Sequence, residues 1–172
     1  MPYELTWISD DLAENYLHDL KLTSRYAALN RDLIAKTIFN GMGWKMGEKI
    51  ESRHNYISQD YILRKGAIEA QDPCIIPINM RDGIILGHGK RHITWNNSAP
   101  HGAGRIFSRS QVQERFTLTD FKKNMQGIYS SCLNTSLDEG PFAYRSLEAI
   151  AHAIKDIVEI EMILSPLYNF KG

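Results

Sequence analysis

A histidine followed by two glycines and two arginines is the most informative group in the chain: His101 precedes Gly102, Gly104, Arg105 and Arg109. Glycines let a backbone approach a ligand closely, N–H groups at a helix start favour anions, and arginines fork onto phosphate oxygens. The pattern predicts an anion site, with a glycine-rich turn whose histidine is merely hydrogen-bonded as the alternative. At such a site a neutral imidazole can be a nucleophile, a metal ligand or a general acid or base, and spacing alone does not choose.

Two further pairs of residues carry weaker signals. His54 and Asn55 lie in an expected strand, where the imidazole could ligate a divalent metal or could be structural. Arg64 and Lys65 come at a strand end and could form either a second phosphate contact or a charged turn. In both cases the residue types suit phosphate or metal chemistry without requiring it.

The segment around His88 and His92 predicts no chemistry of its own. The two histidines have a spacing that suits zinc only on a helix, and Gly89 argues against a helix there. The run Gly-His-Gly-Lys that begins at Gly87 lacks the full glycine pattern of a nucleotide loop. Both histidines are therefore expected to be solvent-exposed.

Composition and charge limit the class of protein. With 43% hydrophobic and 23% charged residues, the chain reads as one ordinary soluble domain. The net charge is zero, although residues 79–116 contain six basic and two acidic side chains. Cys74 and Cys132 predict neither a disulfide framework nor a zinc site, which favours a reducing compartment. No apolar run approaches the roughly 20 residues of a membrane span and the start lacks signal-peptide features, so a cytoplasmic location is expected.

The elements that position these residues are expected to form one α+β domain over residues 1–172, a mixed, short-stranded sheet with flanking helices. A long helix is predicted between Ser9 and Gly43, because apolar residues recur there at spacings of three or four. The other expected elements are strands at 51–58, 61–70, 74–78, 84–86, 128–133 and 158–164, and helices at 106–116, from Thr117 onward, and at 146–157. Residues 87–104 show no periodicity, and loops of this length are usually functional or disordered.

Several motifs occur in the same order as in one enzyme family. They are His54-Asn55, Arg64-Lys-Gly-Ala67, Pro77-Ile-Asn-Met-Arg-Asp-Gly83, Ser98-Ala-Pro-His-Gly-Ala-Gly-Arg-x-x-Ser-Arg109, Pro141-Phe-Ala-Tyr144 and Lys171-Gly172. Together they resemble the RtcB family of RNA ligases, and the resemblance runs to the last residue. It implies an enzyme that uses GTP and manganese to join RNA 2′,3′-cyclic phosphate or 3′-phosphate ends to 5′-hydroxyl ends, in RNA repair or tRNA splicing.

The resemblance also implies roles for individual residues. His101 matches the catalytic histidine that becomes guanylylated, and His54 matches a manganese ligand. The implied GTP-binding residues are His54, Asn55, Pro77, Ile78, Asn79, Met80, His101, Gly102, Ala103, Gly104, Tyr144 and Lys171. The implied phosphate or RNA contacts are Arg64, Lys65, Arg105 and Arg109. Tyr144 matches a tyrosine that stacks on guanine and Lys171 a lysine at the guanine edge, whereas Ile84 stands where many members carry a serine near guanine.

The sequence contains only part of the family's pattern. The family's N-terminal half supplies a cysteine and further metal ligands that have no counterpart here, so this chain alone is not expected to hold two manganese ions. We expect a guanylylated, GTP-binding portion that a separate N-terminal polypeptide or a longer parent chain completes. Its expected partners are GTP and RNA ends, and neither DNA nor a membrane is expected. The surface on which the missing N-terminal half would dock should be apolar and exposed. The alternatives are a non-catalytic GTP- or RNA-binding module and an enzyme that hydrolyses phosphoesters with metal but without GTP.

Overall fold

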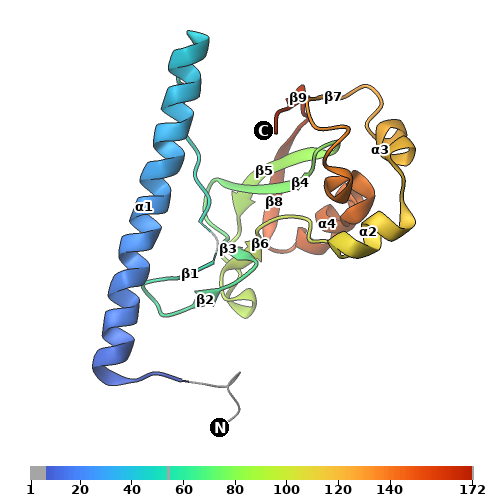
Figure 1. Ribbon diagram of the computed structural model, residues 1–172. Helices are drawn as coiled ribbons and strands as arrows, with labels where there is room; N and C mark the ends of the chain where they lie inside the picture. The colour runs from blue at the N-terminus through green and yellow to red at the C-terminus, as the bar shows by residue number, and fades with distance from the viewer. Residues whose placement is uncertain (1–6, 54, 172) are drawn as a thin grey trace. The chain divides into compact units, whose positions relative to one another are not determined.

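The structure is a computed structural model that describes residues 7–53 and 55–171. The chain divides into two compact units, each with its own internal contacts. One is Met1–Lys49 with Tyr56–Leu63, and the other is Ile50–Asn55 with Arg64–Gly172. Helices and short, mostly antiparallel strands make the fold α+β, as the sequence predicts (Figure 1). Within the described ranges, no helix has the length and apolar character needed to cross a membrane.

One long helix, α1 (Asp10–Met42), dominates the first unit and confirms the helix predicted from apolar spacing. Asp10 and Asp11 place negative charge in its first turn, where the helix dipole favours it. The helix ends at Gly43, whose φ of 66° is left-handed and lets the following backbone bond back to carbonyls of the last turn. The short strand β1 (Tyr56–Ile57) contacts α1 within the same unit.

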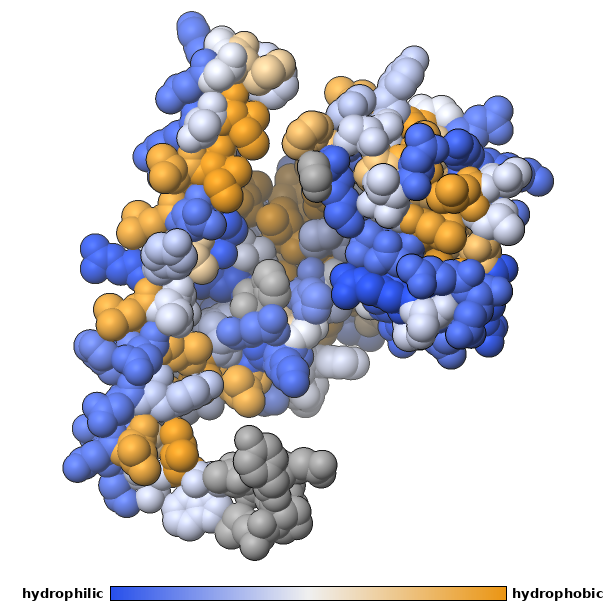
Figure 2. All heavy atoms as spheres, in the orientation of Figure 1, coloured by the Kyte–Doolittle hydropathy of each residue, from blue (hydrophilic) through white to orange (hydrophobic). Residues whose placement is uncertain are grey.

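Most of the large apolar residues of α1 are exposed, and the helix fully buries none of its residues. The exposed large side chains on it are Leu12, Tyr16, Leu22, Tyr26, Leu29, Leu33, Ile34, Ile38 and Met42. Figure 2 shows hydrophobic side chains along the length of this helix. Exposed apolar surface of this kind typically marks a site of contact with another polypeptide. The described residues of α1 therefore provide the apolar surface expected from the sequence.

Three antiparallel strands form the largest sheet of the second unit, and the side chains of the first two alternate between core and surface. In spatial order the strands are β4 (Cys74–Asn79), β5 (Gly83–Gly89) and β8 (Val158–Leu164). Ile76 and Ile85 lie opposite each other in this sheet and are fully buried. They share one hydrophobic core with Ile150 and Ile154 of α4 (Leu147–Ile154). The predicted strands at 74–78 and 158–164 are confirmed.

A separate pair of antiparallel strands, β3 (Ala67–Glu69) and β6 (Ser98–Pro100), precedes the glycine-rich segment. The sequence predicts no regular element at 87–104, and this is wrong. β5 extends to Gly89, a 3-10 helix, η2, spans Ile93–Trp95, and β6 follows. A three-residue strand is too short to show alternation, and its pairing uses backbone groups that nearly every residue carries.

Three predicted strands are shorter than expected, namely those at 51–58, 61–70 and 128–133. The strands observed there are β1, β2 (Leu63–Arg64), β3 and β7 (Tyr129–Ser130), the last paired in parallel with β9 (Tyr168–Asn169). At 61–70 the turn at Gly66, with φ of 71°, interrupts the extended backbone. Residues that favour strands form them only where another strand is available to pair, which the local sequence does not reveal.

Short helices complete the second unit. They are α2 (Arg109–Arg115), α3 (Leu118–Asn124), η3 (Leu137–Glu139) and η4 (Pro141–Ala143). The predicted helix start at Thr117 is confirmed, since its hydroxyl accepts the Asp120 N–H at 3.2 Å and the Asp120 carboxylate accepts the Thr117 N–H at 2.8 Å. The rings of Phe116 and Phe142 stack with centroids 3.9 Å apart, which packs the end of α2 against η4.

Candidate functional site

His101 follows directly after β6, and its side chain is exposed. Because Ala67 pairs with Pro100, His101 comes to lie beside Gly66, the residue before β3. A Cβ atom placed on Gly66 would lie 3.7 Å from both Cδ2 and Nε2 of His101. The His101 N–H also faces the Gly66 carbonyl oxygen, at 3.5 Å. The imidazole therefore rests against the turn that precedes β3.

Asn55 and Gly66 build the turn that supports the His101 ring. Gly66 has a φ of 71°, which glycine adopts without the steric cost of a Cβ atom. Its N–H donates to Oδ1 of Asn55 at 3.1 Å. The structure thus brings Asn55 and His101 to the same turn, whereas His54, the predicted manganese ligand, lies outside the described residues.

The loop after His101 is held against the end of β4. The Ala103 N–H donates to the carbonyl oxygen of Pro77 at 3.0 Å, and the Ala103 side chain is buried. A Cβ atom on Gly102 would lie 3.1 Å from the same oxygen, so only glycine allows this close approach without a shift. The Gly104 carbonyl accepts the N–H of Arg145 at 3.2 Å. Two segments that the sequence assigns to one site are therefore in contact.

The segment Pro77–Met80 ends β4 and forms a turn stabilised by its own side chains. Oδ1 of Asn79 accepts the N–H groups of Arg81 and Asp82, at 2.9 and 2.8 Å, and its Nδ2 donates to the Asp82 carboxylate at 2.8 Å. Burial alone would raise the pKa of Asp82, but hydrogen bonds from Arg81 and Asn79 outweigh it and lower that pKa. Ile78 is buried, so the side chains of Ile78 and Asn79 support the fold of this turn.

The C-terminal segment is attached beside that turn. Nδ2 of Asn169 donates to the Met80 carbonyl oxygen at 2.8 Å. Further along, the Lys171 N–H donates to the Ser131 hydroxyl at 3.0 Å, and that hydroxyl donates back to the Lys171 carbonyl at 3.2 Å. The backbone of Lys171 is thus anchored while the residue remains exposed.

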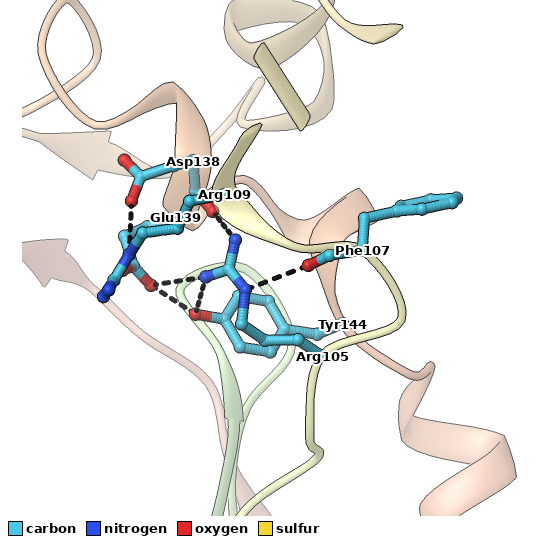
Figure 3. A network of polar contacts seen from close by, with 6 residues as sticks. All are labelled: Arg105, Phe107, Arg109, Asp138, Glu139 and Tyr144. Atoms are coloured by element: carbon cyan, nitrogen blue, oxygen red, sulfur yellow. Dashed lines mark hydrogen bonds and ion pairs between the residues drawn. The ribbon is translucent and has the colours of Figure 1, made fainter. Parts of the chain in front are cut away.

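Tyr144 and Arg105 belong to a network of polar contacts (Figure 3). The Tyr144 hydroxyl donates to the Glu139 carboxylate and accepts a hydrogen bond from Nη1 of Arg105 at 3.1 Å. The Arg105 guanidinium also lies over the Tyr144 ring, 5.1 Å from its centroid. Burial, together with the hydrogen bond to Glu139, raises the pKa of Tyr144 to about 12. The hydroxyl is therefore protonated at neutral pH and engaged with Glu139.

Both arginines of the glycine-rich segment contact the acidic pair Asp138 and Glu139 at the end of η3. Arg105 donates to the backbone carbonyls of Asp138 and Phe107, at 2.5 and 3.1 Å. Arg109 donates to the carboxylates of Asp138 and Glu139, at 3.0 and 3.5 Å. Sequence reasoning missed the two acidic residues, although an adjacent carboxylate pair just before the Pro-Phe-Ala-Tyr motif was a readable signal for partners of the arginines.

A helix start at the glycine loop, which the sequence suggests as part of an anion site, is not found. α2 begins only at Arg109, beyond Gly104. The Ser108 hydroxyl accepts the Gln111 N–H at 3.2 Å, and the Gln111 side chain accepts the Ser108 N–H at 2.9 Å. This reciprocal cap occupies N–H groups at the start of α2. The predicted helix start at the glycine loop is therefore wrong: the helix is shorter than expected, and its own residues cap it.

Arg64 and Lys65 have different environments. Arg64 is 3% exposed, and it donates to the Ser98 hydroxyl and to the Asn96 carbonyl, both at 3.0 Å. These bonds tie Arg64 to the segment that enters β6 and so help to place His101. Lys65 is exposed on the turn that leads to Gly66.

The histidines of β5 and the segment after it stand apart from this arrangement. His88 is exposed, with Nδ1 2.5 Å from the Asp72 carboxylate and Nε2 3.4 Å from that of Glu161. The hydrogen bond to Asp72 raises the pKa of His88. His92 is half-buried, which corrects the expectation that it is exposed, and Nδ1 lies 2.7 Å from the Thr94 hydroxyl. In the described ranges no three His, Cys, Asp or Glu residues could together hold a metal ion, so these residues do not by themselves fit a manganese site.

A sequence model of the family described as tRNA-splicing ligase RtcB matches residues 4–172. The chain belongs to the RtcB family. It is 28% identical to the RNA-splicing ligase RtcB of Escherichia coli K12, in an alignment that covers 92% of this chain and 44% of that protein. The RNA-splicing ligase RtcB1 of another Escherichia coli strain is 27% identical, with the same shares covered. The tRNA-splicing ligase RtcB of Aeropyrum pernix is 28% identical over 83% of this chain and 38% of its own length. The chain therefore spans less than half the length of these RtcB relatives.

Membership of the RtcB family is an assignment to a family of RNA ligases. It confirms the resemblance carried by the glycine-rich motif and by the motifs that flank it. The structure adds that three of these motifs meet in one place, because His101 contacts Gly66 and the loop after His101 contacts Pro77.

Proposed function

We propose that this chain is the GTP-binding, guanylylated portion of an RtcB ligase, with His101 as the nucleophile. The observation that carries the proposal is the position of His101: its ring is exposed, it rests on the turn of Gly66 and Asn55, and the loop after it is fixed to Pro77. An exposed imidazole on an otherwise anchored loop is suited to attack a bound phosphate without a large rearrangement.

The proposed reaction has three displacements at phosphorus. A neutral nitrogen of His101 attacks the α-phosphorus of GTP, forming a P–N bond while pyrophosphate leaves. A 3′-phosphate oxygen of RNA then attacks the same phosphorus, and the imidazole leaves with its electron pair. Finally the 5′-hydroxyl of the second RNA end attacks the 3′-phosphate and loses its proton, and GMP leaves. Imidazole is a good leaving group, which makes the intermediate reactive in the second step.

Tyr144 is proposed to contribute its aromatic ring, stacked on guanine, rather than its hydroxyl. Its hydroxyl is engaged by Glu139 and Arg105, and its pKa of about 12 keeps it protonated. A group in that state is a poor general base near neutral pH, where a catalytic pKa should lie. Lys171 is proposed to contact the guanine edge, since its backbone is anchored and it is exposed.

A complementary polypeptide segment is proposed to complete the site. The described residues do not form a metal site, and the chain covers 44% of the Escherichia coli relative. Manganese, when bound, would neutralise phosphate charge, and most of its ligands would come from that segment. The exposed apolar side chains of α1 support docking of such a segment to the first unit. GTP and RNA ends are the proposed substrates, and the cytoplasm is the proposed location.

The test is covalent labelling with GTP that carries radioactive phosphorus at the α-position. The chain is incubated with manganese, alone and with the N-terminal half of an RtcB relative. Label that resists denaturation but is lost in acid identifies a phosphoramidate, and it should be absent from His101→Ala. A matched control is His152→Ala, since His152 is also exposed in the second unit but lies on α4.

The outcomes separate the candidate functions. Label that depends on His101 and on the added half would establish a ligase portion that needs its complement. Label in the absence of the added half would show that this chain assembles the nucleotide site alone. If a folded chain takes up no label in any mixture, the catalytic proposal is wrong, and a non-catalytic module that binds GTP or RNA becomes the better account.

A further inference from the structure

The two arginines of the glycine-rich segment are held in different ways. Arg105 donates to two backbone carbonyls and to the Tyr144 hydroxyl, lies 3.7 Å from the Glu139 carboxylate, and has a side chain that is 26% exposed. Arg109 has carboxylate partners, Asp138 at 3.0 Å and Glu139 at 3.5 Å, and its side chain is 73% exposed. Figure 3 shows Arg105 enclosed by its partners, with Arg109 beside it against the two acidic residues. Arg105 is thus built into the fold, whereas Arg109 lies on its surface.

Exchange of partners is far easier for Arg109 than for Arg105. An exposed ion pair contributes little to stability, because solvent screens the charges and the long side chains lose freedom. Moving Arg105 would leave the carbonyl groups of Phe107 and Asp138 without their donor, which is costly in a partly buried place. A phosphate group offers Arg109 two oxygens in a geometry that matches its guanidinium group.

We propose that Asp138 and Glu139 are an internal counterion for Arg109. When a phosphate group binds, Arg109 moves from the two carboxylates to the phosphate, while Arg105 keeps its partners. The inference rests on the proposed function, in that the ligand is a phosphate of GTP or of an RNA end at the same site. It adds two residues that tune the affinity for that phosphate. Without ligand the two carboxylates balance the charges of the two arginines, and a bound phosphate takes over part of this role.

Competition between carboxylate and phosphate for Arg109 predicts whether each substitution strengthens or weakens phosphate binding. Asp138→Asn removes the nearer partner of Arg109 but keeps the backbone carbonyl that holds Arg105. Binding of phosphate should therefore tighten by about two- to five-fold, the strength of one exposed ion pair. Arg109→Ala should weaken binding and lower its dependence on salt by about one phosphate contact. In the double variant the gain from Asp138→Asn should disappear, because Arg109, the arginine that the substitution releases, is absent.

The experiment measures binding of two probes to the complete chain, GTP and a short RNA with a 3′-phosphate, by fluorescence anisotropy with labelled ligands. Glu114→Gln is the matched control, since it removes one acidic charge from an exposed residue of α2. A tighter complex with only one probe identifies which phosphate Arg109 contacts. If Glu114→Gln tightens binding as much as Asp138→Asn, or if the gain persists without Arg109, the effect is general charge repulsion and the proposal is wrong.

A second measurement does not depend on catalysis. The arginine Nε–Hε signals of the labelled chain are followed by nuclear magnetic resonance while either probe is added. The signal of Arg109 should move and that of Arg105 should stay, and equal movement of both or movement of neither overturns the proposal. Guanylylation of His101 is measured separately, so a chain that takes up GMP but shows no exchange at Arg109 would refute this inference and leave the proposed function standing.

Discussion

The Tyr144 hydroxyl and the Glu139 carboxylate form a hydrogen bond that connects η3 to the residue after η4. Arg105 donates to the same hydroxyl at 3.1 Å and lies 3.7 Å from the same carboxylate. One acidic side chain therefore holds both the aromatic ring and the arginine that covers it. This arrangement separates the role of the Tyr144 ring from that of its hydroxyl, and the two can be tested apart.

Tyr144→Phe should reduce stability but preserve the nucleotide site. The substitution keeps the ring and removes a hydrogen bond to a charged group, for which we expect a loss of about 1–2 kcal/mol in the free energy of unfolding. Denaturant titration measures the loss, with Tyr129→Phe as control because Tyr129 is 76% exposed. Guanylylation of Tyr144→Phe should stay within a few-fold of the parent chain, and its abolition in a folded variant would show that the hydroxyl itself takes part.

Arg64→Met should destabilise the chain, whereas Lys65→Met should not. Removing the buried guanidinium takes away the donor to the Ser98 hydroxyl and one of the two donors to the Asn96 carbonyl, the other being that hydroxyl. This loss should cost about 1–3 kcal/mol. The exposed Lys65 makes a matched neighbour, with an expected change within about 0.5 kcal/mol. Thermal or denaturant unfolding measures both. Should Lys65→Met prove the more destabilising, the structural role given to Arg64 would be wrong.

His88 should make stability depend on pH. Its pKa lies above the ordinary 6.5 because of the hydrogen bond to Asp72, with smaller contributions from Glu161 and Glu159. A raised folded-state pKa means that the protonated ring stabilises the fold. This stabilisation is complete below the unfolded-state pKa of about 6.5 and is lost as the pH rises through the folded-state value.

The measurement is the midpoint of thermal unfolding across this pH range, for the parent chain and for His88→Gln. The parent should lose stability, relative to the variant, as the pH rises above the ordinary histidine pKa. Asp72→Asn should flatten the difference because it removes the main partner of the ring. Parallel pH profiles for the parent and His88→Gln would contradict the assignment.

The parts of the fold that the sequence predicted are those with a strong local signal. α1 spans 33 residues, which is about nine turns at 3.6 residues per turn, and apolar residues recur along it between an acidic start and Gly43. Its bounds agree with the prediction. Thr117 and Asp120 formed a capping box that could be read from residue types alone. β6 was not predicted and β7 is shorter than the strand predicted at 128–133, because a strand of two or three residues depends on a partner far away in the sequence.

The site was predictable only as separate motifs. Residue types identified His101, its glycines and its arginines, but not the contacts of Gly66 with His101 or of Pro77 with Ala103, which join distant segments. The adjacent carboxylates Asp138 and Glu139 were a readable signal, but only the fold shows that the arginines contact them. The expected helix began too early, at the glycine loop, although Ser108 and Gln111 match the capping signature Ser-x-x-Gln that marks the observed start.

Gly66→Ala should impair guanylylation of His101 beyond its effect on stability. At a φ of 71° an alanine is strained by about 1 kcal/mol or more, and relief of that strain would move the turn on which the His101 ring rests. Space is not the obstacle, since the added Cβ atom would meet the ring at an ordinary 3.7 Å. The hydrogen bond from the Gly66 N–H to Asn55 would weaken as the turn moves.

Gly127→Ala is the matched control for this prediction. Gly127 also has a left-handed φ, of 88°, and a Cβ atom there meets nothing within 4 Å. Both variants should lose similar stability in denaturant titration, because both carry the same kind of backbone strain. Only Gly66→Ala should slow the transfer of GMP to His101 in the labelling assay. Equal labelling rates in the two variants would mean that the turn before β3 does not position the histidine, and that its contact with the ring has no part in the reaction.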